Sequence, residues 1–403
     1  MRSSPVHARR GAGALLLLFL LLAAGVGAFL LLRDGDEPES YSPVDLKNDP
    51  WAYDSGRQHE FESRAAAGHS HVVYVKSPGG ILATARRVDR YRPLVERAAG
   101  EAGVNPDLIE GMVLLESAGS PDARASDDLE SAAGLTQILA QTATGLLGMH
   151  VDVAASERLT RKLSRARGPR QAARIRAQRA RVDERFDPAK ALAATGRYLK
   201  QAKDEFGRED LAVVSYHMGI GNLQNVLGAY GGDGASYAQL YFDTSPDSHP
   251  SAYRKLYALG DDSKTYYWRV LASREVMRLY RDDRAKLERL VELQSGADSG
   301  ELVLQPDGTD DDTEAGSLRP EAAALLAYIR HGVTTVSGVR GPLRVVRRHG
   351  WAFDVRRQYA SDAQAQAFQY MLDRLQALNL IAWSRRGNTI HIAASSEGAK
   401  LRQ

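Results

Sequence analysis

The residue of this 403-residue chain that is best placed for acid–base chemistry is Glu116. It ends the apolar segment Pro106–Ser117 (PDLIEGMVLLES), in which Ile109 and Met112 lie on the face that a helix would bury. Glu116 follows them by seven and four residues and therefore emerges on the same face. Burial disfavours a charged carboxylate, so a proton would stay on Glu116 near neutral pH, as a general acid requires. Spacing alone still favours a structural glutamate, because structural carboxylates outnumber catalytic ones.

The segments that follow Glu116 reverse that balance. They are residues 116–126 (ESAGSPDARAS), 133–138 (AGLTQI), 215–222 (SYHMGIGN) and 262–267 (DSKTYY). In this order they resemble the catalytic domain of the soluble lytic transglycosylases, whose signature is a Glu-Ser helix end, a Gly-Leu-x-Gln helix start, an Ala-Tyr-Asn-Ala-Gly-Pro-Gly segment and a Glu-Thr-x-x-Tyr segment. The resemblance covers residues 88–292 and implies a lysozyme-like, all-helical fold.

The resemblance implies a reaction on peptidoglycan glycan strands. Family members cleave the β-1,4 bond between N-acetylmuramic acid (MurNAc) and N-acetylglucosamine (GlcNAc). Glu116 aligns with the catalytic acid, which protonates the glycosidic oxygen and then deprotonates the muramic 6-hydroxyl, giving a 1,6-anhydro product. Most glycosidases use two carboxylates, whereas this family uses one and needs no cofactor; Asp127 and Asp128 are interpreted as solvated loop residues. A lysozyme-type muramidase, which hydrolyses the bond, and a non-catalytic wall-binding scaffold are the alternatives.

Three supporting residues carry over from the family around the acid. Ser117 is expected to hydrogen-bond near the carboxyl group of Glu116. Gln137 is expected to hold an acetamido or hydroxyl group of the substrate, and Tyr216 to orient Glu116. A helix cap or a buried tyrosine would use the same residue types for structural purposes alone.

The later motifs add four substrate-side residues. Gly219 and Gly221 are expected to let the backbone approach the sugar closely. His217 stands where the family has asparagine, and Tyr266 matches the tyrosine of the last motif, with the neighbouring Tyr267 as the other possible register. These departures from the family pattern bear on substrate specificity more than on the reaction itself.

The N-terminus predicts where the protein resides. Residues 12–32 form an uncharged apolar run, and about 20 such residues span the ~30 Å bilayer core as a helix. Arg9 and Arg10 precede the run and acidic residues follow it, so residues 1–11 would be a cytoplasmic tail and the C-terminal bulk extracytoplasmic. We expect an uncleaved, single-pass anchor in the cytoplasmic membrane, in preference to a cleaved signal peptide.

The rest of the chain divides by composition and periodicity. Residues 33–87 are polar and proline-containing and are predicted to be a membrane-proximal spacer with one short strand at residues 71–76. Helical periodicity runs through the domain at 88–292, and an acidic linker at 293–319 leads to a small α+β domain at 320–403. In that last domain we expect helices at 321–330 and 363–378, with β-type runs at 333–336, 343–346 and 389–393. The predicted fold class is mostly α.

The charge balance and the absence of cysteine limit the kinds of binding partner and site that the chain can have. The chain has 53 Lys and Arg against 50 Asp and Glu and no cysteine, which excludes disulfides, thiolate zinc sites and a lipid-modified cysteine. The near balance does not select nucleic acid. Residues 158–181, however, form a basic insertion with ten Lys and Arg and no acid. Such a run is either a solvated helix face or a contact for anionic wall polymers or lipid headgroups.

The C-terminal domain carries a second resemblance, at residues 336–340 (VSGVR), 349–354 (HGWAFD) and 389–391 (TIH). These segments resemble the D-alanyl-D-alanine carboxypeptidase family of zinc peptidases. Arg340 aligns with the arginine that grips the stem peptide's terminal carboxylate, and Asp354 and His391 align with zinc ligands. Arg347 occupies the first ligand position and Asn388 that of the general base. A cation repels zinc and an amide accepts no proton, so we predict a domain without metal or hydrolysis that keeps stem-peptide binding through Arg340.

Overall fold

The computed structural model describes residues 49–232, 234–295, 300–304 and 317–402. These residues form two compact units. Pro121–Ala191 forms the smaller one, and the described residues before Pro121 and after Ala191 form the larger one. The apolar run at residues 12–32, expected to be a membrane anchor, lies outside the described residues. In the part that is described, no helix is long and apolar enough to cross a membrane.

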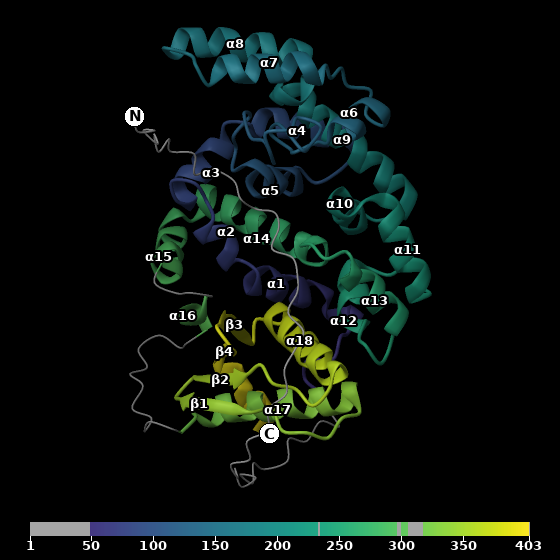
Figure 1. Ribbon diagram of the computed structural model, residues 1–403, viewed down its shortest axis with the longest axis vertical. Helices are drawn as coiled ribbons and strands as arrows, with labels where there is room; N and C mark the ends of the chain where they lie inside the picture. The colour runs from purple at the N-terminus through teal and green to yellow at the C-terminus, as the bar shows by residue number, and fades with distance from the viewer. Residues whose placement is uncertain (1–48, 233, 296–299, 305–316, 403) are drawn as a thin grey trace, which may run out of the picture. The chain divides into compact units, whose positions relative to one another are not determined.

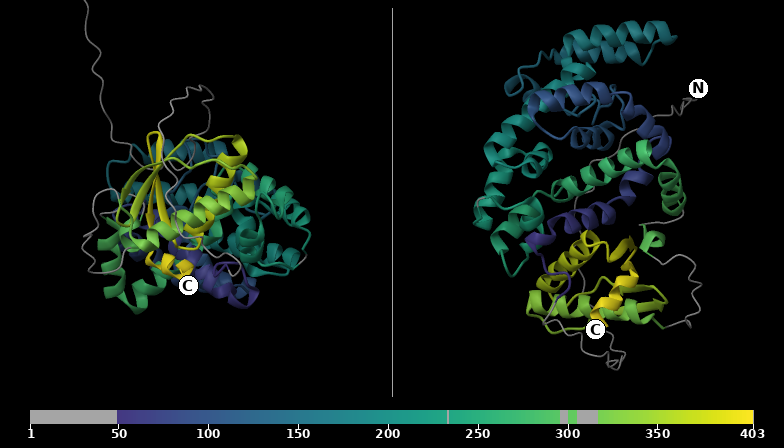
Figure 2. Two further views of the ribbon diagram at one scale, coloured as in Figure 1. Left: turned by 90° about the horizontal axis from the view of Figure 1, so that it is seen from below. Right: turned by 180° about the vertical axis from the view of Figure 1, so that it is seen from behind.

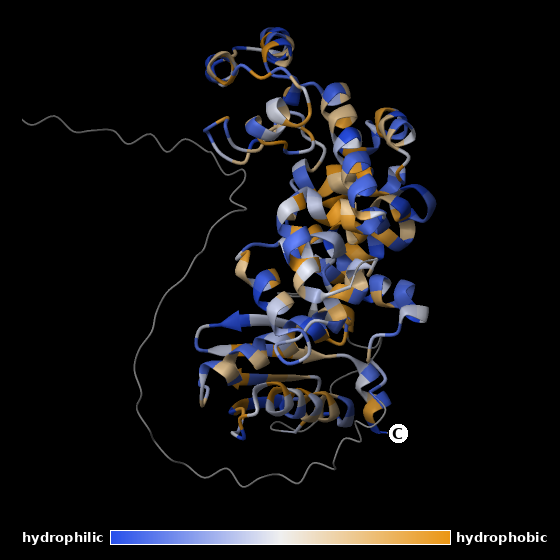
Figure 3. Cartoon of the chain, turned by 90° about the vertical axis from the view of Figure 1, so that its right-hand side faces the viewer, coloured by the Kyte–Doolittle hydropathy of each residue, from blue (hydrophilic) through white to orange (hydrophobic). Residues whose placement is uncertain are grey.

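The larger unit is mostly helical up to residue 304, in agreement with the predicted fold class (Figure 1). Its apolar residues gather where the helices meet (Figure 3). The helices are α1 (Gln58–Gly68), α2 (His71–Val75), α3 (Ile81–Asp89), α4 (Arg92–Ala102), α5 (Pro106–Ser117), α9 (Pro188–Phe206, which begins in the smaller unit), α10 (Glu209–Met218), α11 (Ile220–Tyr230), α12 (Tyr237–Asp243), α13 (Pro250–Ala258), α14 (Ser263–Asp282), α15 (Arg284–Ser295) and α16 (Glu301–Leu304).

Residues 49–87 are folded, in contrast to the spacer that we expected. Phe61 of α1 and Ile81 of α3 are buried in the core of the unit. The strand expected at residues 71–76 is also wrong, because α2 occupies that segment. Its β-branched valines favour a strand locally, but Val73 is buried and α2 packs against α3, α14 and α15. Tertiary packing therefore overrides the local propensity.

Helices α5 and α14 form the centre of this unit and lie side by side (Figure 1). Asn105 caps α5 by accepting a hydrogen bond from the Asp107 amide, and Pro106 begins the helix. Gly111 lets the two helices approach, since a Cβ there would lie 2.7 Å from the Val270 carbonyl oxygen of α14. The helix ends at Ala118, which takes a left-handed φ of 52°.

The smaller unit contains an irregular loop followed by a helical hairpin. Isolated bridges at Arg124–Ala133 and Ala133–Ile138 shape the loop, and α6 (Ala140–Gly145) follows it. The basic insertion falls on the hairpin of α7 (Val153–Leu163) and α8 (Pro169–Val182), and α8 begins directly after Gly168. A buried pair of Arg185 and Asp183 then ties the hairpin's end to the loop through carbonyl groups that include Leu129.

Residues 317–402 form the predicted small α+β domain (Figure 2). Its elements are α17 (Pro320–Ser337), β1 (Val345–His349), β2 (Ala352–Arg356), α18 (Asp362–Ala377), β3 (Ile381–Arg386) and β4 (Thr389–Ala394), with an antiparallel strand order of β1-β2-β4-β3. The β-type run expected at 333–336 is wrong, because α17 continues to Ser337 and buries Val333. The strand predicted at 389–393 is confirmed as β4, whereas β2 and β3 were not singled out from the sequence.

The acidic linker predicted at 293–319 is only partly described. Helix α15 extends into it as far as Ser295, and the short α16 lies within it with Leu304 buried. Residues 296–299 and 305–316 lie outside the described residues. The α+β domain therefore begins close to the boundary that composition indicated.

Candidate active site

Glu116 lies in the last turn of α5 and is half-buried. Its Oε1 accepts a hydrogen bond of 2.7 Å from the hydroxyl group of Tyr266 on α14. Burial raises the pKa of Glu116 to about 7, while the Tyr266 hydroxyl and the charge of Arg269 act in the opposite direction. The carboxyl group can therefore hold or release a proton near neutral pH, which is the property that acid–base catalysis needs.

Tyr266 is held in place from its other side by His217 of α10. The two rings stack with centroids 4.9 Å apart, and His217 Nδ1 lies 2.9 Å from the hydroxyl oxygen of Ser263. Burial lowers the pKa of His217, so its ring is neutral at neutral pH. The pKa of Tyr266 is raised by burial and by Glu116, so its hydroxyl stays protonated and available as a donor. Of the predicted residues, Tyr266 thus bonds to Glu116, and His217 stacks on Tyr266.

Arg269 is the positive charge that acts on Glu116, and the sequence reasoning missed it. Its buried guanidinium donates to the Asp262 carboxylate at 2.7 Å and to the Asp262 carbonyl at 2.9 Å. The spacing contained the signal, because Arg269 follows Tyr266 by three residues and so shares its helix face. With its charge partly compensated by Asp262, Arg269 moderates the pKa of Glu116 without forming an ion pair with it.

The structure gives each of Tyr216 and Ser117 a nearby hydrogen-bonding group, and their predicted roles stay predictions. The Tyr216 hydroxyl lies 3.4 Å from that of Thr195, and the bond that orients Glu116 comes from Tyr266. Ser117 donates to the carbonyl of Val113, one turn back in its own helix. A serine in a helix commonly bonds in this way.

The two tyrosines of the last motif are also distinguished by the fold. Tyr266 faces Glu116, whereas the buried ring of Tyr267 packs against Trp268 and against Tyr237 of α12. Consecutive helical residues point about 100° apart, so only one of the pair can reach the carboxyl group. The register is therefore the one that places Tyr266 at the site.

Gly219 and Gly221 lie in different backbone environments. Gly219 joins α10 to α11 with a φ of 86°, a conformation that disfavours residues with a Cβ, and its amide donates to the Ser215 carbonyl. Gly221 lies in the first turn of α11, where a Cβ would meet no atom within 4 Å. A side chain at position 221 would therefore meet no neighbouring atom, and the predicted substrate role of Gly221 stays a prediction.

Gln137 belongs to the smaller unit. Its backbone takes a φ of 53°, and its side-chain amide donates to the Gly134 carbonyl at 2.9 Å. Gly134 in turn approaches the Arg185 carbonyl so closely that a Cβ would collide with it. The amide group that was predicted to hold substrate therefore makes a local bond that fixes this turn.

The residues that align with a zinc site lie side by side on three neighbouring strands. Asp354 of β2 faces Arg347 of β1 and His391 of β4 in the sheet register. Asp354 Oδ1 lies 2.7 Å from His391 Nδ1, and Oδ2 lies 3.6 Å from Arg347 Nε. Across the described residues, no group of three or more His, Cys, Asp or Glu side chains is arranged to hold a metal ion. Because a guanidinium faces the aspartate, this donor set does not fit zinc. Arg340 is exposed in the loop after α17.

The chain matches one family model, described as the transglycosylase SLT domain, over residues 163–238. That stretch contains the motif from Tyr216 to Gly221. In the sequence it lies between Glu116 and Tyr266, whose side chains are hydrogen-bonded to each other. No curated protein and no solved structure matches the chain significantly. The chain therefore carries a transglycosylase SLT domain, and by that domain it is a peptidoglycan lytic transglycosylase, an enzyme that cleaves glycosidic bonds of the cell wall.

Proposed function

We propose that this protein cleaves the β-1,4 bond between MurNAc and GlcNAc, with Glu116 as the single acid and base, and releases a 1,6-anhydro-MurNAc end. The observation that carries the proposal is the hydrogen bond from the buried Tyr266 hydroxyl to the half-buried Glu116, whose pKa is about 7. A carboxyl group with that pKa is present in both protonation states at neutral pH, and the proposed reaction uses both in turn.

The reaction is balanced without water. Protonated Glu116 gives its proton to the glycosidic oxygen as the bond from that oxygen to the MurNAc C1 carbon breaks. The resulting carboxylate then takes the proton of the muramic 6-hydroxyl, whose oxygen forms the new bond to C1. Between the two transfers, the Tyr266 hydroxyl and the Arg269 charge stabilise the carboxylate. At the end Glu116 is protonated again and ready for the next bond.

The surroundings of Glu116 favour a one-carboxylate mechanism over lysozyme-type hydrolysis. Within the larger unit, its pKa is set by burial, by the Tyr266 hydroxyl and by the charge of Arg269. The nearby Asp262 is bound to Arg269. A two-carboxylate glycosidase would need its second acid about 5–10 Å from the first. The 6-hydroxyl of the sugar supplies the nucleophile instead.

Digestion of purified peptidoglycan by wild type and Glu116→Gln tests this proposal. We expect wild type to release anhydro-muropeptides, identified by mass spectrometry, and Glu116→Gln to release none. The matched control is Glu101→Gln, an exposed glutamate on α4, which should leave the product pattern unchanged. Reducing MurNAc ends from wild type would favour the hydrolase, and equal digests from all three proteins would favour the non-catalytic scaffold.

We further propose that residues 12–32 anchor the protein in the cytoplasmic membrane with the catalytic unit outside. The support is the uncharged apolar run between an arginine-rich start and an acidic stretch. The full chain should stay in membranes after alkaline carbonate extraction, and a variant without residues 1–40 should be released. A mature N-terminus beginning inside or just after residues 12–32 would show instead that the segment is a cleaved signal.

The α7–α8 hairpin is proposed to contact an anionic wall polymer. Its exposed cations include Arg165, Arg167, Arg170 and Arg174, while its bulky apolar side chains such as Leu163 are half-buried. This surface offers charge but little apolar area for insertion into lipid. Replacing the four arginines with glutamine should abolish salt-sensitive retention on immobilised poly(glycerol phosphate). Loss of binding to anionic vesicles alone would point to a lipid surface.

The exposed Arg340 is proposed to hold the terminal carboxylate of a stem peptide. The support is its alignment and its exposed position in the loop after α17. Calorimetric titration with a peptide ending in D-alanyl-D-alanine should show binding that Arg340→Gln removes. Arg357→Gln, which alters an exposed arginine after β2, is the matched control. Equal affinity in all three proteins would leave the domain without this role.

A further inference from the structure

The C-terminal α+β domain packs directly against the catalytic helices of the larger unit. Helix α18 lies beside α1 (Figure 1). Gln376 of α18 donates to the carbonyl of Gly68 at the end of α1. A Cβ at Gly68 would collide with the Gln376 carbonyl oxygen, so the two helices approach more closely than side chains would allow. This is the packing of one folded body and not of a module on a flexible tether.

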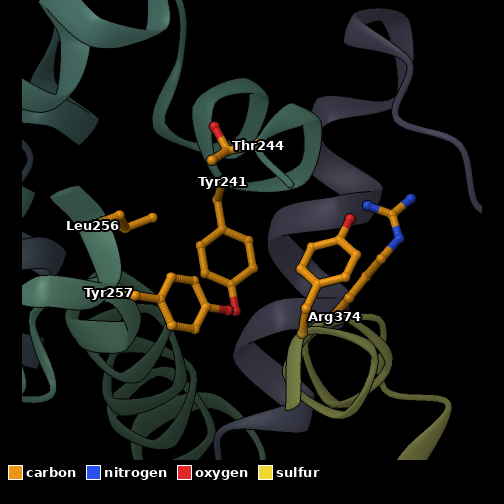
Figure 4. Close-up of a pocket in the computed structure, with 6 residues that line it drawn as sticks. Tyr241, Thr244, Leu256, Tyr257 and Arg374 are labelled. Carbon is orange, nitrogen blue, oxygen red and sulfur yellow. The ribbon is translucent and has the colours of Figure 1, made fainter. Parts of the chain in front are cut away.

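Arg374 makes the second set of contacts across this interface. Its guanidinium donates to the carbonyls of Phe242 at 2.7 Å and of Trp51 at 2.9 Å, which belong to two separate segments of the catalytic part. A small cavity of about 10 Å³ lies beside it, with the rings of Tyr241 and Tyr257 across from Arg374 (Figure 4). Both carbonyls would lose a donor if the domain moved away, which opposes such movement.

The third contact reaches α14, the helix that carries Tyr266. Asp373 is buried, and its Oδ2 accepts from the ammonium group of Lys264 at 2.7 Å and from the Tyr257 hydroxyl at 3.1 Å. Gln369 donates to its other oxygen at 2.8 Å. The Lys264 ammonium also lies 3.6 Å from the centre of the Tyr257 ring. Because the group is shielded from solvent, salt screens this ion pair less than a surface pair.

Lys264 belongs to the first turn of α14, which also carries Ser263 and Tyr266. Ser263, the residue before it, bonds to His217, and Tyr266, two residues after it, bonds to Glu116. The Lys264 carbonyl accepts from the hydroxyl of Tyr237 at 2.7 Å, which fixes this turn from another side. A shift of Lys264 would therefore move the His217 stack and the Tyr266 hydroxyl together.

We propose that Asp373 is a positioning residue of the catalytic centre: by holding Lys264 it fixes the first turn of α14, and the C-terminal domain thereby supports the alignment of Tyr266 with Glu116. The domain thus has a task in the reaction that needs neither a metal nor bound peptide. This inference rests on the proposed role of Glu116.

The test compares Asp373→Asn with a control at the same interface. Asp373→Asn weakens the hold on Lys264, and we expect kcat to fall by about tenfold with KM unchanged, since small misplacements of catalytic groups slow reactions strongly. A looser Tyr266 stabilises the Glu116 carboxylate less, so the alkaline limb of the pH–rate profile should move to higher pH. Glu397→Gln is the control, because it breaks the pair with Arg64 on α1 and leaves α14 untouched. It should leave kcat and the limb unchanged.

A second variant and a double-mutant cycle keep the outcome decisive. Lys264→Met removes the same ion pair from the other side and should change kcat and the alkaline limb in the same direction. The two substitutions combined should cost no more activity than either one. Normal kcat and an unmoved limb in folded Asp373→Asn and Lys264→Met would overturn the inference. If wild type and Glu116→Gln are equally inactive, the proposed function itself has failed, which is a different result.

Discussion

Two glutamates on the same helix, six residues apart, have opposite environments. Glu110 of α5 is fully buried and its carboxylate pairs with Arg92 at 3.0 Å and with Arg281 at 2.6 Å. Glu116 is half-buried and accepts a bond from the neutral Tyr266. Two guanidinium groups compensate the first charge, whereas a hydroxyl group compensates the second only in part. A carboxyl group that must give up and regain a proton needs the weaker compensation.

The largest expected difference between the two glutamates is in how much catalytic activity is lost when each is replaced. Glu116→Gln is expected to lower the rate of glycan cleavage by at least about 10³-fold, because the amide can neither donate nor accept the catalytic proton. Glu110→Gln should keep most of the activity per folded molecule. Release of soluble muropeptides from purified wall measures both. If the two variants lose activity equally, the distinction between the two ends of α5 is wrong.

The effects of the two substitutions on protein stability should rank in the opposite order, with Glu110→Gln the more damaging. Glu110→Gln leaves Arg92 and Arg281 without their shared buried carboxylate, and we expect a loss of about 1–3 kcal/mol in the free energy of unfolding. Urea denaturation followed by circular dichroism measures it. Glu116→Gln in the same experiment at pH 5 should unfold close to wild type. A Glu110→Gln protein as stable as wild type would show that these ion pairs contribute no net free energy to folding.

The pH dependence of stability sharpens the comparison further. The pKa of Glu116 in the folded protein, about 7, lies above its value in the unfolded chain, so the folded state binds the proton more tightly. Stability from this group is therefore present below about pH 4.5 and is lost as pH rises towards 7. Glu116→Gln should be more stable than wild type above pH 7, by about 1–2 kcal/mol for a half-buried group. Melting temperatures of both proteins at pH 5 and pH 8 test this, and parallel curves would contradict it.

The smallest effect concerns the hydroxyl of Tyr266. Tyr266→Phe removes the hydrogen bond that favours the carboxylate of Glu116, so the pKa of Glu116 should rise. The alkaline limb of kcat/KM should move up by less than about one pH unit, and kcat should fall by roughly tenfold. Tyr267→Phe is the matched control, because that ring packs against Trp268 away from the site. A limb that stays in place in Tyr266→Phe would remove the tyrosine from the mechanism.

The sequence was informative wherever a local rule was strong. The periodicity of residues 106–117 matches α5, and the spacing from Met112 predicted that Glu116 lies on its apolar face. The same rules failed for α2 and for the end of α17, where valines favour a strand locally and burial against neighbouring helices decides the outcome. Propensities amount to fractions of a kcal/mol per residue, so tertiary packing outweighs them.

Within the candidate site, motif order pointed to Tyr216 and Tyr266 without saying which of them contacts Glu116. Tyr216 and Tyr266 both occur in motifs, and only their positions show that Tyr266 bonds to Glu116 while Tyr216 lies against Thr195. The predicted roles of Gln137 and Gly221 stay predictions. Arg269 was absent from the prediction: its spacing puts it on the helix face of Tyr266, but only the fold shows that its buried charge acts on Glu116.

The sequence by itself named Glu116 as the candidate acid, the helix that carries it, the family motifs and the arginine at position 347 that argues against a zinc site. Each of these depends on residues that are close in the chain or on a pattern of residue types. Only the tertiary structure decided which groups adjust the pKa of Glu116, and that Asp373 holds Lys264 from 109 residues away. Burial and through-space charge set these properties, and both depend on which distant segments the folded chain brings together.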